Sequence, residues 1–516
     1  MPGEYSDEAA AARKEVHDAV APSSLTFRFS IWASVLRPTR LSPIVAAVAV
    51  TCATFVVFLL TLAPDVTWAY YGTDGGELIT AAVTLGVPHP PGYPLYVLLG
   101  KLVSLIPVSE SVAYRFNLFS ALCMALSAGL LAAAVGRRRN ACIAKMGITG
   151  LPHDLPLDIS VLAPALFAGT CFAFLPLVWQ QAVIAEVYAL NMLAVGLSLW
   201  FITQPEPRAG LVGLALGLAM TTHLTSSILL LPALLAVRPS GWRRFAGGLA
   251  SGLVPFLALP WLATRGSPVV WGWPDTLAGW WWQVSASIYR PNLFSLPAPN
   301  WAARVEGWLA EPTIWVALVL LAIVMQRRQR LAQKLGRLQW GLLAASGTYA
   351  VYAFAYDAPD SLVFILPALA LLCFQAAMAI DSGKSLLLLL PLALLVINFQ
   401  QIDLSEQTEA RSLAESTLRD APPDAIILTS GDRTTFTLWY LQHVEGQRRD
   451  LIVVDDNLLA FDWYRTRLSQ AHPKLAGLDA DDLAQFRRLN GARRPWCELR
   501  FDAERNVHFH CMGQPA

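Results

Sequence analysis

Residues 43–63 read PIVAAVAVTCATFVVFLLTLA and contain no charged side chain. About 20 apolar residues are needed for a helix to cross a bilayer, and comparable runs recur along the 516-residue chain. Of all residues, 55% are hydrophobic and only 15% are charged, against about 25% charged residues in average soluble domains. The sequence therefore predicts an all-α protein with many membrane spans, because a helix satisfies its own backbone groups, which lipid cannot do.

The charge balance excludes several classes of protein. The 38 Lys and Arg residues nearly cancel the 37 Asp and Glu residues, so there is no basic field for nucleic acid. The sequence has neither a Walker-type P-loop nor a Gly-rich dinucleotide loop, which argues against an ATP-driven pump. Because no metal-ligand spacing is found either, we expect no metal and no cofactor.

The apolar runs predict about eleven spans, and Arg clusters at 137–139, 243–244 and 327–330 indicate which loops are cytoplasmic. This pattern gives a cytoplasmic leader, a membrane domain and an extracytoplasmic tail. Their predicted ranges are 1–42, 43–399 with outer loops 64–112 and 264–312, and 400–516. The spans are expected near 43–63, 113–135, 159–177, 183–203, 209–222, 225–238, 245–263, 313–325, 338–356, 361–379 and 384–399.

The tail has the pattern of a small α/β domain. Apolar runs at 425–430 and 450–455 predict two buried strands, and residues 435–444 between them have helical spacing. A strand–helix–strand unit implies a parallel pair of strands. Cys497 and Cys511 share this tail and would be free to form a disulfide outside the cytoplasm, although their spacing alone leaves this open.

The first outer loop contains the stretch TDGGELITAAVTLGVPHPPGYPLYVLLGK at residues 73–101. Asp74 and Glu77 stand three residues apart on one face of a predicted helix, where a carboxylate can act as a general base toward a hydroxyl. The same spacing also fits a capping box at the helix start. Two short interfacial helices, 78–85 and 94–106, are expected on either side of a rigid turn at 89–94.

This stretch and several others resemble the bacterial protein O-mannosyltransferase-like membrane proteins. That family is related to eukaryotic transmembrane O-mannosyltransferases and belongs to the GT-C glycosyltransferases. The chain departs from the family pattern at Gly75 and Arg433. The further matching motifs are AYRFNLFSAL (113–122), WQQAVIAEVYALN (179–191), THLT (222–225), WGWPD (271–275), Tyr289-Arg290, PDS (359–361) and LTSGD (428–432).

The resemblance implies a GT-C fold and a polyprenyl-phosphate donor that carries mannose or a similar hexose. The sugar would move, with inversion, to a protein or glycan acceptor on the outer face. The family's acidic base matches Asp74, and Glu77 is the second candidate. The candidates for binding the donor phosphate or the substrate are His89, Tyr93, Arg115, Glu186, Tyr188, Asn191, His223, Trp273, Tyr289 and Arg290.

Several of these candidates have a plainer structural interpretation. Arg115 suits bidentate phosphate binding, but an arginine at the interface also snorkels. His89 either donates to the substrate or packs in its turn. Glu186 and its neighbours Tyr188 and Asn191 either bind the sugar or hold helices together through hydrogen bonds.

The sequence also leaves open the roles of four further residues or groups. His223 lies at the apex of a short hairpin and either lines a cavity or supports the bundle. Asp360 fits a helix N-cap. Arg265 is a further phosphate candidate besides Arg290. The Trp-rich outer loop, with three consecutive residues at 280–282, forms an interfacial aromatic belt or stacks on sugars.

The composition, rich in Ala, Leu and Arg, suggests a bacterial plasma membrane with an outward-facing site. Two other functions compete with a transferase. The first is a transporter or flippase of lipid-linked sugars, which internal repeats and midplane ionisable sites would favour. The second is a membrane anchor whose tail binds a partner or a glycan.

Overall fold

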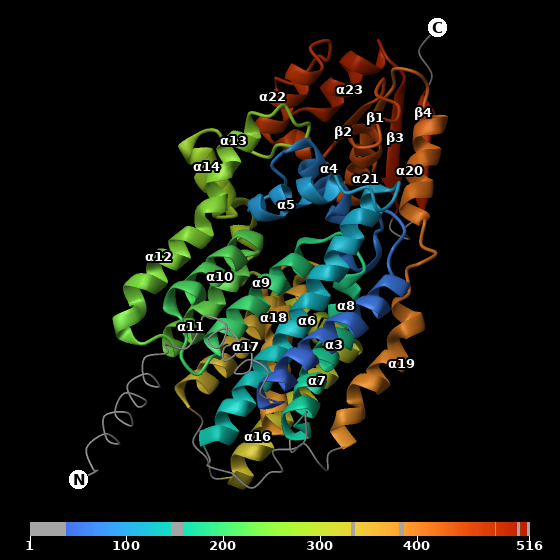
Figure 1. Cartoon of the computed structure of the whole chain (residues 1–516). Coiled ribbons are helices and arrows are strands. Elements are labelled where there is room, and N and C mark those ends of the chain that lie inside the picture. The colour runs from blue at the N-terminus through green and yellow to red at the C-terminus, as the bar shows by residue number, and fades with distance from the viewer. Residues whose placement is uncertain are drawn as a thin grey trace, which may run out of the picture.

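The computed structural model describes residues 38–145, 158–331, 336–380, 386–479, 481–502 and 506–512. The predicted leader, residues 1–42, falls almost entirely outside these ranges. Figure 1 shows an elongated molecule with a bundle of helices at one end and the C-terminal residues packed on the other.

The bundle is built around α6 (Val112–Lys145), which packs against three other long helices. α18 (Leu366–Ala379) is buried along almost its whole length. The other helices of the bundle are α3 (Pro38–Leu60), α7 (Ile159–Phe174), α8 (Pro176–Ala182), α9 (Val187–Ile202), α10 (Ala209–Thr222), α11 (Leu230–Ala236), α12 (Trp242–Leu253), α16 (Pro312–Leu331), α17 (Arg337–Ala355) and α19 (Leu390–Ile402).

Within the described residues, four helical segments are long and apolar enough to cross a membrane, or six if each of two bent pairs is one span. α7 and α8 meet at 70° just before Pro176, so the predicted run at 159–177 is bent. A proline cannot continue the hydrogen-bond ladder of a helix interior, which explains the break. Four other predicted spans coincide with apolar helices of 10–17 residues, so a total of eleven spans stays a prediction.

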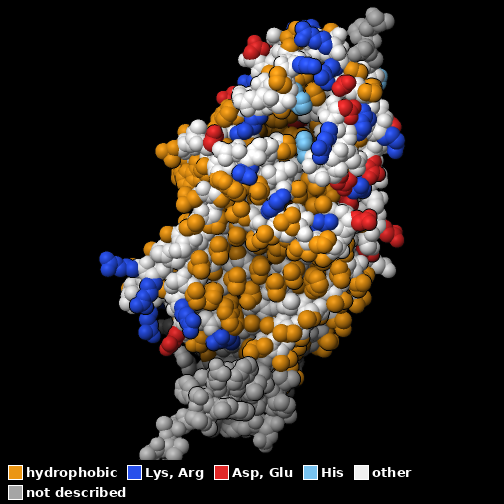
Figure 2. All heavy atoms as spheres, turned by 45° about the horizontal axis from the view of Figure 1, so that its top comes forward, with side chains coloured by type: hydrophobic (Ala, Val, Ile, Leu, Met, Phe, Trp, Pro, Cys, Tyr) orange, Lys and Arg blue, Asp and Glu red, His pale blue; other side chains and the backbone are white. Residues whose placement is uncertain are grey.

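The surface of the molecule changes in polarity along its length. Figure 2 shows a broad band of hydrophobic side chains, with charged side chains gathered above it over the C-terminal part and at its lower edge. Arg139 donates to the carbonyls of Ala377 and Ile380, and Arg327 donates to the carbonyl of Ala379. The C-terminal ends of α6, α16 and α18 therefore meet at the end of the bundle opposite the C-terminal residues (Figure 1).

The loop after α3 folds into a 3-10 helix and two short α-helices. These are η1 (Ala69–Asp74), α4 (Gly75–Thr84) and α5 (Pro94–Ser104). The prediction of two short helices separated by a Pro-rich turn is confirmed. The turn is also tied to the later outer loop, because Val87 and Val270 form an isolated parallel bridge.

The later outer loop is made of short helical segments. They are α14 (Leu277–Val284), η5 (Ser287–Asn292), η6 (Ala298–Asn300) and α15 (Trp301–Ala310). η4 (Val254–Ala258) and α13 (Leu259–Ala263) precede this loop and complete the apolar segment Pro239–Ala263. The segment η7 (Ser361–Ile365) follows α17, and η2 (Leu224–Leu229) follows α10.

The C-terminal residues form a four-stranded sheet of order β2-β1-β3-β4. β1 (Ile426–Thr429) lies parallel to β2 (Ile452–Asp455) and to β3 (Trp496–Phe501), and β4 (Val507–Met512) runs antiparallel to β3. The helices are α20 (Glu409–Asp420), α21 (Asp432–His443), α22 (Asp462–Ala471) and α23 (Leu483–Gly491). The predicted strand–helix–strand unit with a parallel pair is confirmed by β1, α21 and β2.

Cys497 and Cys511 lie directly opposite each other on β3 and β4 and form a disulfide. The sequence alone left this pairing open. The bond links the last two strands of the sheet, which belong to the unit formed by residues 405–512, called the C-terminal unit below.

The C-terminal unit docks on the first outer loop through α21. A methyl group added to Gly76 of α4 would stand 2.3 Å from the carbonyl oxygen of Phe436. The indole N–H of Trp68 donates to the carbonyl of Arg433 and to the hydroxyl of Thr437, each at 3.0 Å. The Ala113 N–H donates to the Tyr440 hydroxyl at 3.1 Å.

An ion-pair network adds to this contact. Arg411 of α20 bonds to Asp65 in the first outer loop and to Glu445, each at 2.8 Å. The Asp65 side chain is almost fully buried, and the Arg411 side chain is about one quarter exposed.

We expect Gly76→Ala to weaken this docking, because the added methyl group would collide with the backbone of α21. The expected loss is about 1–3 kcal/mol, measured as a lower Tm in detergent and faster proteolytic release of the C-terminal unit. Gly247→Ala in α12 is the matched control, since no atom lies within 4 Å of the added methyl group. Equal stability of the two variants would contradict the close contact.

Candidate active site

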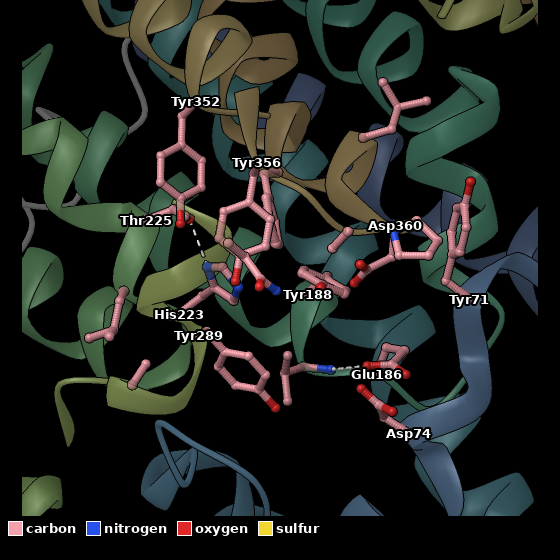
Figure 3. A pocket seen from close by; sticks show the side chains of 18 of the residues that line it. Tyr71, Asp74, Glu186, Tyr188, His223, Thr225, Tyr289, Tyr352, Tyr356 and Asp360 are labelled. Atoms are coloured by element: carbon pink, nitrogen blue, oxygen red, sulfur yellow. Dashed lines mark hydrogen bonds between the residues drawn. The ribbon is translucent and has the colours of Figure 1, made fainter. Parts of the chain in front are cut away.

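A cavity of about 1690 Å³ lies between the helix bundle and the C-terminal unit. Its wall combines segments that are far apart in the sequence: the first outer loop, the start of α9, the hairpin after α10, η5, α17, the approach to η7 and the start of α21. Figure 3 shows Asp74 and Glu186 pointing toward each other, with Asp360 on the same side of the cavity and His223 on the other.

Asp74 reaches the cavity because of the backbone around it. Tyr70 and Tyr71 both adopt left-handed φ angles, 54° and 67°, which turn the chain sharply before the helix. Gly75 lets the chain approach the Ala185 carbonyl, which a methyl group there would meet at 3.0 Å. As a result the Asp74 side chain lines the cavity and is 31% exposed.

His89 stands between two carboxylates. Its Nδ1 lies 2.5 Å from Oε2 of Glu77, and its backbone N–H donates to Oε1 of the same residue at 3.1 Å. Its Nε2 lies 3.7 Å from Oδ2 of Asp74 and 3.2 Å from the hydroxyl of Tyr93. The order Glu77–His89–Asp74 places a fully buried carboxylate behind the histidine and a cavity-lining one in front of it.

This arrangement shifts the pKa values of Asp74 and His89. Enclosure by protein raises the pKa of Asp74 to about 6, and the nearby Glu77 adds to the rise while the positive charge of His89 opposes it. Burial lowers the pKa of His89, but Glu77 and Asp74 outweigh it and raise the pKa to about 10. Asp74 therefore titrates close to neutral pH, beside a histidine that stays protonated.

The capping-box alternative for Asp74 and Glu77 is wrong in this structure. Asp74 occupies the N-cap position of α4, but its side chain makes no capping hydrogen bond. Glu77 does not reach back to the helix start, since both of its oxygens are engaged by His89. Glu77, the second candidate for the base, does not line the cavity.

Glu186 joins the cavity from the start of α9. Its Oε2 accepts the Val187 N–H at 3.3 Å, as an N-cap does. Its Oε1 is buried and has no hydrogen-bond partner among the described residues. This oxygen is therefore an unsatisfied buried acceptor on a residue of the cavity wall.

An aromatic wall faces the carboxylates. The rings of Tyr188, His223 and Phe364 pack on one another at 5.3–6.5 Å. His223 Nδ1 lies 2.7 Å from the Thr225 hydroxyl, and Figure 3 shows Tyr352 and Tyr356 on the same side. The predicted residues Tyr93, Tyr188, His223, Tyr289 and Arg290 all line the cavity.

Three predicted binding residues lie elsewhere. The Arg115 guanidinium donates to the carbonyls of Ser104 and Ser109. Asn191 donates to Ala219, Thr222 and Ser226, and so follows the interhelical alternative. Trp273 lies under the guanidinium of Arg467, at 5.5 Å.

The remaining candidates in the later outer loop also lie outside the cavity. Arg265 stacks over Trp261 at 5.2 Å and does not line the cavity. None of the three consecutive tryptophans lines it either, and Trp280 donates its indole N–H to the Phe256 carbonyl.

Sequence reasoning missed four charged residues of the cavity wall, one of which is Glu311. Asp360 was assigned to an N-cap, but its side chain makes no capping bond at η7 and lines the cavity. Asp432 and Arg433 reach the cavity from the C-terminal unit. A signal existed for this pair, because ligands bind outside the carboxyl ends of parallel strands, and both residues follow directly after β1.

No group of three or more His, Cys, Asp or Glu side chains with the geometry of a metal site is found in the described ranges. The expectation of a site without metal stays a prediction.

Two family models match this chain. The model described as Protein O-mannosyl-transferase TMEM260 N-terminal domain matches residues 74–239, which include Asp74, His89, Glu186 and His223. TMEM260-associated domain 2 matches residues 410–481, which include Asp432 and Arg433.

Curated relatives carry the same name. Protein O-mannosyl-transferase TMEM260 of Mus musculus is 28% identical over 491 residues, which cover 84% of this chain. The Dictyostelium discoideum protein of that name is 28% identical over 152 residues, 28% of this chain. The aligned part spans 66% of the mouse relative and 16% of the Dictyostelium relative.

Among solved structures, the crystal structure of ArnT from Cupriavidus metallidurans bound to undecaprenyl phosphate aligns with a TM-score of 0.49 at 12% identity. The alignment covers 89% of this chain and 93% of that one. The sequence matches confirm the resemblance found in the motifs: the chain is similar to the TMEM260 protein O-mannosyl-transferases over residues 74–239 and 410–481.

Proposed function

We propose that this protein is a membrane glycosyltransferase that moves mannose or a similar hexose from a polyprenyl-phosphate donor to a protein hydroxyl. The observation that carries the proposal is Asp74, a cavity-lining carboxylate with a pKa raised to about 6 and a protonated histidine behind it. The names of the relatives support mannose as the sugar and a protein as the acceptor.

Asp74 is the general base. A base works best when its pKa lies close to the working pH, and burial brings this carboxyl into that range. The positive charge of His89 keeps it from rising further, so Asp74 is ionised at neutral pH. Glu77 acts through His89 and is a positioning residue.

An apolar arm of the cavity suits a polyprenyl chain. Its lining residues are Ala344, Gly347 and Val351 of α17 and Leu224 and Ile228 of η2. Val351 keeps 61% of its surface exposed, so the arm is open at the outside of the bundle. A polyprenyl chain bound in this arm would not be exposed to water.

Arg290 is positioned for the donor phosphate. It lines the cavity in η5, and Leu293 and Phe294, which also line it, follow closely in the sequence. A guanidinium matches a phosphate through two parallel hydrogen bonds. The free Oε1 of Glu186 then accepts a hydrogen bond from a sugar hydroxyl.

The reaction is a single displacement. Asp74 takes the proton of the acceptor hydroxyl, and the hydroxyl oxygen forms a bond to C1 of the sugar. The bond between C1 and the phosphate oxygen breaks, and its electron pair leaves with the polyprenyl phosphate. One displacement inverts the configuration at C1, and Arg290 stabilises the charge on the departing phosphate.

The cavity would open on the extracytoplasmic side of a bacterial plasma membrane. It lies at the end of the bundle opposite the Arg clusters, which are typical of cytoplasmic loops. The disulfide of the C-terminal unit also fits an oxidising compartment.

The central test is Asp74→Asn in the full chain in nanodiscs with radiolabelled polyprenyl-phosphate mannose and a protein acceptor extract. We expect a loss of about 10²–10⁴-fold in transfer rate, since that is what a general base contributes. Asp420→Asn, an exposed residue of α20, is the control.

Full activity of Asp74→Asn would remove Asp74 from the mechanism. If the wild type transfers none of a series of lipid-linked hexoses but moves them across proteoliposome membranes, the chain is a flippase.

Glu77→Gln tests the relay through His89. Removing the Glu77 charge lowers the pKa of His89, and a neutral His89 no longer holds down the pKa of Asp74. Glu77 itself raises the pKa of Asp74, but the influence of His89 is larger, so the loss of the His89 charge decides the direction. Activity needs the Asp74 carboxylate, so it is full above pH about 6 and falls as the pH drops through that value. In the variant this acid limb should move to higher pH, whereas Glu110→Gln in the same loop should leave it in place. An unmoved limb with a lowered Tm would mean that Glu77 is structural.

Arg290→Gln should raise the KM for the lipid donor about tenfold, the usual cost of losing a hydrogen bond to a charged group. The KM for the acceptor should change little. Arg265→Gln, in the same outer loop but outside the cavity, serves as the control. An unchanged donor KM in Arg290→Gln would assign the phosphate to another residue.

A further inference from the structure

The charges on the cavity wall are unequal. Two of its described residues carry a guanidinium, Arg290 and Arg433. The carboxyl groups that line it belong to Asp74, Glu186, Glu311, Asp360 and Asp432. Protonated His89 also lines the cavity, but it already faces the carboxylates of Glu77 and Asp74, so an entering anion is attracted mainly to the two guanidinium groups.

Arg433 is held by two aromatic rings. Its guanidinium carbon lies 5.3 Å from the ring centre of Trp68 and 5.1 Å from that of Phe501. The two rings are 5.6 Å apart at 87° to each other. The Arg433 backbone is fixed as well, because its carbonyl accepts the Trp68 indole N–H.

The aromatic contacts leave the hydrogen-bond donors of Arg433 unused. Across the described part of the chain, the guanidinium has neither a hydrogen bond nor an ion pair with a protein group, although Asp432 is its neighbour. Because the rings of Trp68 and Phe501 stand at 87° to each other, the guanidinium plane can stack on at most one of them. Arg433 is thus a pre-positioned cation with free donors.

Arg433 and Arg290 belong to different parts of the chain. Arg290 lies in η5, and Leu293 and Phe294, which also line the cavity, follow closely in the sequence. Arg433 belongs to the C-terminal unit, and its neighbour Asp432 interacts electrostatically with Asp74, Glu77 and His89. Tyr289, the neighbour of Arg290, also interacts electrostatically with Asp74, Glu77 and Asp432, so the two cations approach the base from different elements, Arg433 from the C-terminal unit and Arg290 from η5.

We propose that Arg433 is an acceptor-binding residue that holds the carboxylate of an Asp or Glu side chain close to the Ser or Thr hydroxyl that receives the sugar. This inference rests on the proposed function and deepens it. Held against the rings of Trp68 and Phe501, Arg433 selects protein segments with an acidic residue beside the acceptor hydroxyl.

The test uses the full chain in phosphatidylcholine nanodiscs and two fluorescent Ser/Thr peptides that differ only in Glu or Gln beside the hydroxyl. Binding is followed by anisotropy, and transfer from polyprenyl-phosphate mannose is followed as kcat/KM. We expect the wild type to prefer the Glu peptide about tenfold in both measurements, as a charge-assisted hydrogen bond gives.

Arg433→Gln should abolish this preference and leave the donor KM within about twofold, while Arg433→Lys should keep part of it. The matched control is Arg487→Gln, because Arg487 also stacks on a tryptophan of the C-terminal unit, Trp496, but lies outside the cavity. Its peptide preference should equal that of the wild type.

The inference is overturned if the wild type does not distinguish the peptides or if Arg433→Gln keeps the preference. It is also overturned if Arg433→Gln raises the donor KM alone, or if a glucuronide competes and the Glu peptide does not. Transfer without preference would leave the transferase proposal standing. If peptide binding shows an Arg433-dependent preference but no sugar is transferred, the anion site stands and the proposal of a transferase is wrong.

Discussion

The buried pair of Glu77 and His89 is the contact on which the candidate site depends. Both side chains are almost completely enclosed, and their closest atoms are 2.5 Å apart. Burying two charges carries a large desolvation cost, which is offset here by short contacts from the His89 ring and backbone to one carboxylate. The pair fastens the Pro-rich turn to α4 and places a positive charge beside Asp74. Breaking it would alter the shape and the electrostatics of the site together.

A second constraint comes from the C-terminal unit. The cavity has no complete wall without it, because Asp432 and Arg433 close the side next to the first outer loop. The close approach of Gly76 to the backbone of α21 sets this distance, and the Arg411 network ties the unit to Asp65. The site is therefore assembled from residues whose positions range from 74 to 433, and small shifts in docking would change it.

The sequence predicted the kinds of side chain at the site better than it predicted which particular residues line the cavity. Four predicted residues line the cavity: Asp74, Glu186, His223 and Tyr289. Each belongs to a short polar motif in apolar surroundings, and such motifs often mark a functional site. Arg115 and Asn191 fit the same rule, yet Arg115 donates to carbonyls of the first outer loop and Asn191 to carbonyl and hydroxyl groups within the bundle. Local pattern does not reveal whether a buried polar group finds a protein partner.

The placement of Arg433 was hidden for a different reason. Its strand–helix context was readable, as the confirmed parallel pair of β1 and β2 demonstrates, but the orientation of the sheet toward the bundle depends on tertiary contacts such as Trp68 with Arg433.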